Sequence, residues 1–403
     1  MTRGFTIFLN GVIRASWQVV TVVGMSFAIA AAALFLVFTG AVHFGSIAVA
    51  MRRCRPAREF LPPPAHAPAV TIVRPICGLE NFIEETLRSS FLLDYPRVEI
   101  LFCCARADDP AAPLAQRLMA DYPWIDARLL IGNERISGNP KLNNMFKGWR
   151  EASHDFVVFA DSNVLMPRDY VQRLLTEFDD QAGLVCSPPV GSRPRNLWAD
   201  VECAFLNGYQ ARWQILADTM GLGFAQGKTM MWRKADLERA GGIRRLADET
   251  AEDAASTKIV REAGRKVRIV DAPFPQPLGH RAFTDVWKRQ ARWAQLRRAS
   301  FLKFFLPEIV SGALPPLFAT AFLAFAFELP LVATLSAFAT LWYGAEMLLA
   351  YTAGWPLSSR SLLASMLRDL MIPPLWAMAW SDAGFVWRGN VMTLEDESVE
   401  TVR

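Results

Sequence analysis

The sequence predicts an α/β domain with a largely parallel sheet, anchored by apolar helices on both sides of it. Hydrophobic residues make up 52% of the 403 residues and charged residues 20%, and the mean hydropathy is +0.18. A soluble protein would usually be more charged, so we expect membrane-embedded segments. Between residues 69 and 300, short apolar runs alternate with helix-like runs, a pattern typical of parallel sheets covered by helices on both faces.

Composition and charge exclude several classes of protein. The 27 Phe and 13 Trp supply material for a packed core, so the chain is not mainly disordered. A net charge of only +4 argues against binding nucleic acid through bulk charge. The six cysteines show no Cys-x-x-Cys spacing, which predicts reduced, buried thiols rather than a zinc module or a disulfide framework.

The first predicted element is a membrane-spanning helix over residues 19–51, which contain no Asp, Glu, Lys or Arg. Such a helix would extend roughly 50 Å, beyond a hydrocarbon core of about 30 Å. A signal peptide is the alternative, but its apolar part would span only about 7 to 15 residues. Because Arg52, Arg53, Arg55 and Arg58 follow the span, the positive-inside rule places the next domain in the cytoplasm. We expect an integral, multi-pass protein of the inner or plasma membrane.

A Pro- and Ala-rich run at 62–68 predicts a linker into the α/β domain. The predicted strands of this domain are, in chain order, 70–73, 98–104, 127–131, 156–159, 184–187 and 267–270. The predicted helices are 80–91, 111–121, 141–152, 168–178, 197–219 and 252–262.

A basic segment follows the α/β domain. Residues 284–305 contain six basic residues against one acid, with aromatic residues interleaved. This pattern predicts an interfacial helix with an aromatic face in the headgroup boundary and basic groups toward phosphates; a solvated basic helix is the alternative.

Apolar segments return after this helix. Residues 309–327 and 331–353 are predicted spans, with Glu346 as the single charge inside the second. Residues 362–380 are shorter and contain charged residues and two prolines, so they could span, re-enter or lie at the interface. The predicted parts are an N-terminal segment with its helix (1–51), a linker (52–69), the α/β domain (70–283), the basic helix (284–308), a transmembrane or re-entrant region (309–385) and a polar tail (386–403).

Polar motifs follow the predicted strands, where open α/β sheets bind their ligands. A further motif lies in the basic helix. In chain order the motifs are Asp108-Asp109, Asn139-Pro140-Lys141, Asp161-Ser162-Asn163, Glu252-Asp253 and Arg289-Gln290-Ala291-Arg292-Trp293. Each strand-end motif alone fits turn or N-cap chemistry, and the motif in the basic helix alone fits a solvated basic helix, but together they indicate a ligand site.

The order of these motifs resembles the D, D, D, (Q/R)xxRW signature of processive and lipid-directed family 2-like glycosyltransferases. More narrowly, the sequence is similar to the ceramide glucosyltransferase family, family 21, in which Asp-Asp-Pro, Asn-Pro-Lys-x-Asn-Asn, Arg-Lys with Ala-Gly-Gly, and Glu-Asp occur in this order. The matching residues here are Asp108-Asp109-Pro110, 139–144, Arg233-Lys234 with Ala240-Gly241-Gly242, and Glu252-Asp253. The resemblance covers about residues 70–310 and the membrane layout.

The resemblance implies a GT-A fold, a Rossmann-like sheet that binds a nucleotide-sugar. The implied reaction is inverting transfer of a hexose from a UDP-sugar, with UDP-glucose expected, to the hydroxyl of a membrane lipid such as ceramide or diacylglycerol. By the matching motifs, Asp109 would contact the uridine, Asp161 and Asn163 would hold Mg²⁺ or Mn²⁺, and Asp253 would be the general base. The diphosphate would be bound by Lys141, Arg289 and Arg292, and the acceptor by Trp293 and Glu252.

Two positions depart from the family pattern. Asn163 stands where the Asp-x-Asp metal motif has its second carboxylate, so we expect lower metal affinity. The helix at 197–219 carries Asn207 and Gln210 but lacks the His that eukaryotic ceramide glucosyltransferases share there. The alternatives are a processive polysaccharide synthase, a hopanoid or phospholipid-headgroup sugar transferase, and a catalytically silent membrane scaffold. The sugar, the lipid and the oligomeric state stay open.

Overall fold

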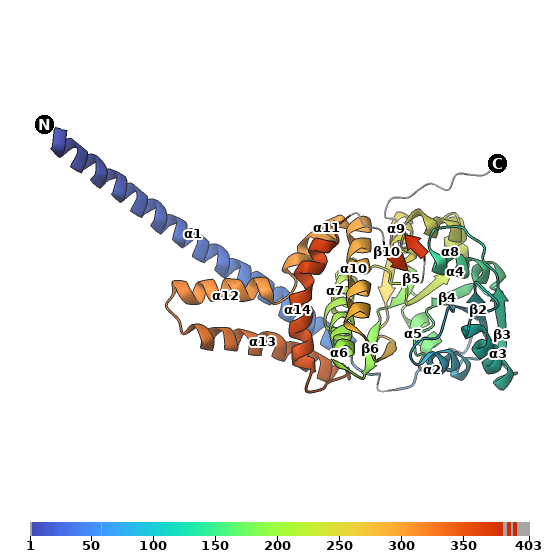
Figure 1. Ribbon diagram of the computed structural model, residues 1–403. Coiled ribbons are helices and arrows are strands. Elements are labelled where there is room, and N and C mark those ends of the chain that lie inside the picture. Colours follow the sequence, from blue (N-terminus) through green and yellow to red (C-terminus); the bar gives the residue numbers. More distant parts are fainter. Residues whose placement is uncertain (1, 58, 382–384, 388–389, 393–403) are drawn as a thin grey trace.

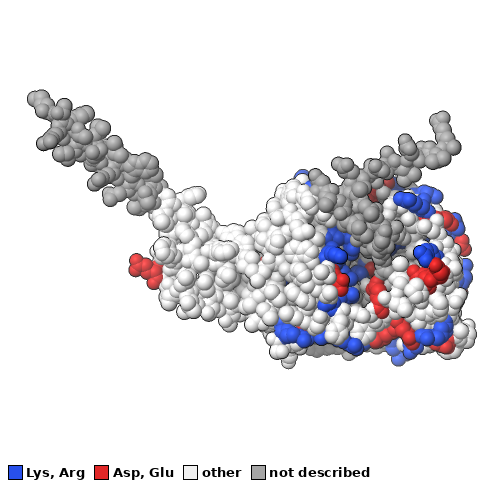
Figure 2. Space-filling model, viewed as in Figure 1, with Lys and Arg blue, Asp and Glu red and all other residues white. Residues whose placement is uncertain are grey.

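The computed structural model describes residues 2–57, 59–381, 385–387 and 390–392, so most of the predicted polar tail at 386–403 lies outside the described residues. Apolar helices form one end of the molecule and the α/β domain forms the other (Figure 1). On the face shown in Figure 2, and outside the residues drawn in grey, Lys, Arg, Asp and Glu are concentrated on the α/β end and nearly absent from the helical end. This separation of charged from apolar surface is what a membrane-anchored enzyme domain requires.

The α/β domain is built on a seven-stranded sheet with the order β3-β2-β1-β4-β7-β5-β8. Six strands lie within two residues of their predicted bounds. They are β1 (Val70–Pro75), β2 (Val98–Cys104), β3 (Asp126–Ile131), β4 (Phe156–Ala160), β5 (Ala182–Ser187) and β8 (Lys266–Ile269). Strands β1, β2, β4 and β5 are buried on both faces, which is why their sequences are mainly apolar and do not alternate with polar residues.

The seventh strand, β7 (Thr229–Arg233), is not predicted by the sequence and makes the sheet mixed. It lies between β4 and β5 and pairs antiparallel with both, with Thr229 opposite Ala160. Only its first residue is β-branched, and periodicity alone cannot distinguish so short an apolar run from a buried helix. Strands β6 (Val190–Pro194) and β9 (Pro275–Gly279), which form a separate two-stranded parallel sheet, also escape prediction because they contain prolines.

The helices of the domain follow the predicted ones. Helices α3 (Ala111–Asp121) and α9 (Glu252–Glu262) have the predicted bounds, and α4 (Pro140–Glu151) is displaced by one residue. The run at 80–91 forms α2 (Ile83–Arg88) and a 3₁₀ turn, and the run at 168–178 forms α5 (Tyr170–Thr176). The run at 197–219 is continuously helical, as α6 (Leu197–Cys203), a π-helical segment η2 (Ala204–Ala211) and α7 (Arg212–Thr219). The short helix α8 (Lys234–Arg239) and the 3₁₀ helix η3 (Ile243–Asp248) follow β7.

Two helices within the described residues are long and apolar enough to cross a membrane. They are α1 (Thr2–Arg53), over its part Gly24–Arg53, and α13 (Leu331–Thr352). The predicted span at 309–327 is shorter than expected, because α12 (Leu314–Ala326) has only 13 residues. Together with the segment Leu302–Val310, from which it is bent by 42°, α12 would form a third, broken span. Helices α12 and α13 form a hairpin that packs against α1 (Figure 1).

The basic helix and the segment at 362–380, whose placement the sequence does not decide, lie between the two ends of the molecule. The basic helix is α10 (Phe283–Ser300), followed by the short α11 (Leu302–Phe305) and a 3₁₀ turn at Leu306–Val310. The segment at 362–380 forms α14 (Ser361–Met378), which packs on α6, η2 and α10 and crosses the base of the α12–α13 hairpin (Figure 1). It is not among the helices apolar enough to span a membrane, and we assign it to the boundary between the hairpin and the α/β domain.

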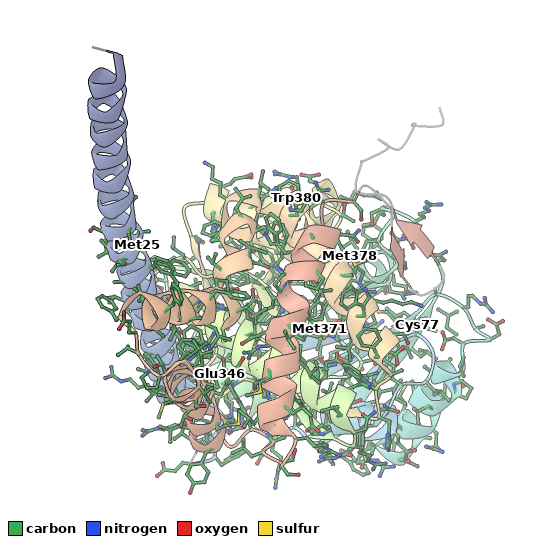
Figure 3. All side chains as sticks on the ribbon, turned by 60° about the vertical axis from the view of Figure 1, so that its left-hand side comes forward. Met25, Cys77, Glu346, Met371, Met378 and Trp380 are labelled. Carbon is green, nitrogen blue, oxygen red and sulfur yellow. The ribbon has the colours of Figure 1, made fainter. Side chains whose placement is uncertain are left out.

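A buried ionic network joins the hairpin to the α/β domain. Glu346 of α13 accepts two hydrogen bonds of 3.0 Å from Arg368 of α14 and lies 3.6 Å from Arg212 of α7. Asp369 accepts from Arg368 at 2.9 Å and from the Tyr343 hydroxyl at 3.0 Å. Figure 3 shows Glu346 among the helices near the base of α13, and all four charged residues are at most 4% exposed. The two carboxylates of α13 and α14 are therefore balanced by Arg368 and by Arg212 of the α/β domain.

Candidate active site

One cavity of about 1640 Å³ collects the predicted site residues. It lies at the carboxyl ends of β1, β2 and β4 and continues to α1 and α13, where Val42, His43 and Trp342 line it. The predicted residues that line it are Asp109, Lys141, Asp161, Asn163, Glu252, Asp253, Arg289, Arg292 and Trp293. The sheet therefore brings together side chains that come from five separate motifs.

Asp109 is held by backbone amides after β2. Its carboxylate accepts hydrogen bonds from the N–H groups of Gly78 at 2.8 Å and Ala111 at 2.9 Å. These contacts tie the loop after β1 to the start of α3. The sequence places an acidic group after a strand, and the structure shows that this group fixes the shape of the cavity rim.

Asn139 positions Lys141 at the start of α4. The Asn139 side chain accepts hydrogen bonds from the backbone N–H groups of Lys141 at 2.9 Å and Leu142 at 3.2 Å, and Pro140 occupies the first helical position. Asparagine before proline is a favourable N-terminal signal for a helix. The Asn139 amide also donates to Glu252 at 2.7 Å, which links α4 to α9.

Lys141 bridges two acidic side chains. Its Nζ lies 2.7 Å from Oδ1 of Asp161 and 2.7 Å from Oε1 of Glu252, and it also donates to the Gly227 carbonyl. A Cβ atom at Gly227 would lie 2.7 Å from Glu252 Oε1 and 2.8 Å from Lys141 Nζ, so only glycine leaves room for this ion pair. Lys141 and Asn139 each contact one carboxylate oxygen of Glu252. The predicted contact of Glu252 with the acceptor substrate stays a prediction.

Lys228 is a site residue that sequence reasoning missed. Its Nζ lies 2.7 Å from Oδ2 of Asp161 and 3.2 Å from Oδ1 of Asn163. Burial alone would raise the pKa of the Asp161 carboxyl, but Lys141 and Lys228 hold it well below its usual range. Burial lowers the pKa of Lys228. Lys228 directly precedes β7, which pairs with β4, so it faces the end of that strand; because β7 is not predicted, no local signal in the sequence marks Lys228 as a site residue.

Asp253 lies in the first turn of α9, where the sequence places it. Ala251 occupies the N-cap position, so Asp253 does not cap the helix; its Oδ2 accepts from the Gly227 N–H at 3.0 Å. The N-terminus of a helix favours the ionised form of a nearby carboxylate. Burial and the neighbouring Glu252 carboxylate outweigh this effect and raise the pKa of Asp253 to about 6. The group is therefore still mostly ionised at pH 7.

Helix α10 supplies the last three predicted residues. Arg289 donates to the buried Glu202 of α6, whose other oxygen lies 3.3 Å from Nε of Arg281. Trp293 packs against a small apolar cluster that includes Leu206 and Leu278. Arg289 is thus fixed by a buried carboxylate on a neighbouring helix, while Arg292 and Trp293 face the same cavity.

No group of three or more His, Cys, Asp or Glu that could hold a metal ion occurs among the described residues. The two predicted ligands, Asp161 and Asn163, do direct one oxygen each at a single cation, the ammonium of Lys228. Their oxygen atoms therefore converge as metal ligands must, and further ligands would come from substrate phosphates and water, as is usual for Mg²⁺.

The carboxyl edge of the α/β sheet carries acidic and basic groups in one cavity, and apolar helices adjoin the sheet. These features define a membrane-associated glycosyltransferase of the predicted GT-A class. The chain belongs to glycosyl transferase family 21, whose sequence pattern matches residues 27–399. The predicted family, α/β fold class and enzyme class are thereby confirmed.

The chain is similar to two relatives and to one solved structure. The chain is 28% identical over 346 residues to ceramide glucosyltransferase 3 of Caenorhabditis elegans, covering 81% of this chain and 73% of that protein. It is 40% identical over 111 residues to a ceramide glucosyltransferase of Komagataella phaffii, covering 27% of this chain and 22% of the relative. The mannosyltransferase PcManGT of Pyrobaculum calidifontis, solved with GDP-mannose and Mn²⁺, is 22% identical with a TM-score of 0.48, covering 86% of this chain and 98% of that one.

Proposed function

We propose that this chain transfers glucose from UDP-glucose to the hydroxyl group of a membrane lipid such as ceramide or diacylglycerol. The observation that carries the proposal is the continuity of the cavity, which extends from the charged sheet edge to α1 and α13. A lipid acceptor could reach the cavity at the end that these helices line without leaving the bilayer. The relatives named ceramide glucosyltransferase support glucose as the sugar and ceramide as one candidate acceptor.

The donor would be bound at the sheet edge. Asp109, at the rim formed by the loops after β1 and β2, would accept hydrogen bonds from the uridine. Lys141, Arg289 and Arg292 would surround the diphosphate. Cleavage of the sugar–diphosphate bond leaves charge on the leaving group, and fixed cations in a partly buried cavity stabilise that charge.

Asp161 and Asn163 would hold a divalent cation, Mg²⁺ or Mn²⁺. When bound, it would neutralise charge on the leaving diphosphate. Asp161 would supply the one formal charge among the protein ligands, because Asn163 contributes only an amide oxygen. The donor set is hard and oxygen-based, as these cations require.

Asp253 would remove the proton from the acceptor hydroxyl. A pKa of about 6 is close to the working pH, which suits a general base. The Gly227 N–H fixes one carboxylate oxygen, so the other can face the acceptor. Trp293 would cover the acceptor, and Glu252 would border it while holding Lys141 in place.

The test is UDP release by the full-length protein in detergent, with and without added lipid. We expect release from UDP-glucose to depend on ceramide or diacylglycerol and the product to be a monoglucosylated lipid by mass spectrometry. Lipid-independent polymer formation would identify a polysaccharide synthase instead. Absence of turnover with every nucleotide-sugar and lipid would refute the proposal.

We propose that the catalytic domain faces the cytoplasm, because nucleotide-sugars are made there and the arginines at the C-terminal end of α1 favour this orientation. Cys77 offers a direct test, because it is the one exposed residue among the six cysteines and lines the cavity (Figure 3). A membrane-impermeant maleimide should label it only after cells are permeabilised. The Cys77→Ala variant serves as the control, and labelling of intact cells would overturn this topology.

A further inference from the structure

Lys228 lies at the point on which the oxygen atoms of Asp161 and Asn163 converge. Its Nζ is 2.7 Å from one and 3.2 Å from the other. Backbone pairing fixes this arrangement, because Lys228 directly precedes β7 and its carbonyl accepts from the Asp161 N–H at 3.0 Å. The ammonium is therefore held opposite the end of β4 by the sheet itself.

A divalent metal bound by the same two oxygens would have to lie about 2.0 to 2.6 Å from each of them. That position coincides with the position of the Lys228 ammonium. Two positive charges at such short range repel each other strongly in a partly buried site. Metal binding therefore requires the Lys228 ammonium to move.

Lys141, on the opposite side of Asp161, is not the group that would leave. Three acceptors hold it, and two of these, Glu252 and the Gly227 carbonyl, are independent of the metal ligands. Both hydrogen bonds shown for Lys228 go to the metal ligands themselves. Lys228 also lines the cavity, which gives its side chain room to move toward an anionic donor.

We infer that Lys228 is a tethered cation that competes with the divalent metal for Asp161 and Asn163 and is released toward the donor diphosphate when the metal binds. This inference rests on the proposed function in taking these two residues as metal ligands. Without metal, Lys228 adds to the charge compensation of the partly buried Asp161, because the other partner of Asp161, Lys141, is shared with Glu252. It also lowers the apparent metal affinity, which is proportional to the fraction of molecules whose site is free of the ammonium.

The test is a Mn²⁺ titration of the full-length protein in detergent without nucleotide, with free Mn²⁺ measured by electron paramagnetic resonance. Lys228→Met removes the charge at similar length and should tighten Mn²⁺ binding about tenfold or more. Lys228→Arg keeps the charge and should bind as weakly as the wild type. Lys234→Met is the matched control, because Lys234 donates to the Ala152 carbonyl on another part of the domain.

The Asp161→Asn variant separates this inference from the proposed function. If Mn²⁺ binding is unchanged by Asp161→Asn, the proposed metal site is wrong. If Asp161→Asn abolishes binding but Lys228→Met does not tighten it, only the inference is overturned.

A measurement on the wild-type chain avoids dependence on the folding of the variants. Reductive methylation of Lys228, followed by peptide mass spectrometry, should become faster when Mn²⁺ saturates the site, because the ammonium leaves its carboxylate partner. Methylation at an unchanged rate would contradict the inference, and Lys234 provides the internal reference.

Discussion

Asp253→Asn is expected to lower kcat by about 10² to 10⁴, the range for losing a positioned general base. Asparagine has the same shape and can still accept the hydrogen bond from Gly227, so the start of α9 should be preserved. It cannot take a proton from the acceptor. Affinity for UDP should change little, because the proposed donor contacts come from Asp109, Lys141 and Arg292.

Steady-state kinetics with a lipid acceptor and calorimetric titration of UDP would measure both effects. Asp248→Asn, on an exposed residue in η3 shortly before α9, is the matched control and should leave kcat unchanged. Near wild-type turnover of Asp253→Asn would refute the base assignment. Loss of UDP binding would instead move Asp253 into the donor site.

The same residue sets the pH dependence of the reaction. A base must be ionised, so kcat/KM should be constant above the pKa of about 6 and fall about tenfold per pH unit below it. This acid limb should be absent from the residual activity of Asp253→Asn. An inflection near pH 4 in the wild type would show that burial and Glu252 do not raise the pKa of the base.

Glu346→Gln is expected to reduce the free energy of unfolding by about 3 to 5 kcal/mol, the cost of removing one partner from a buried ion pair. Glutamine keeps the volume of the side chain but leaves Arg368 and Arg212 without their shared counter-charge. Both guanidinium groups are almost completely buried, so water cannot replace the lost interaction.

Thermal unfolding of the detergent-solubilised protein would show this as a fall in Tm of several degrees. The matched control is Glu328→Gln, the same substitution at an exposed turn between α12 and α13. It should leave the Tm almost unchanged. Equal Tm values for the two variants would mean that the network contributes nothing to stability.

The sequence predicts those parts of the fold that local patterns determine. Strands β1, β2 and β4 are buried on both faces, so their sequences are mainly apolar and predict strands. The motifs after these strands are found because parallel strands bring their carboxyl ends to one edge of the sheet. Helix α9 is predicted with its observed bounds because its acidic first turn marks where it begins.

The parts that escape prediction depend on pairing between distant segments. The segment β7 forms a strand by pairing with β4 and β5, between which it lies. This pairing places Lys228 beside Asp161. Likewise, Glu202 is an ordinary helical residue in the sequence and becomes the partner of Arg289 only when α6 meets α10. Charge and propensity are local properties, whereas these contacts are set by tertiary packing.

The buried network also determines what can be prepared in the laboratory. Arg212 belongs to the catalytic domain, but its counter-charge, Glu346, belongs to a membrane helix. A chain truncated before α12 would leave this guanidinium unbalanced and would uncover the apolar faces of α6 and η2 that α14 covers. A water-soluble catalytic fragment is therefore not expected to fold. Crystallisation and inhibitor screening need the intact chain in detergent or a lipid nanodisc.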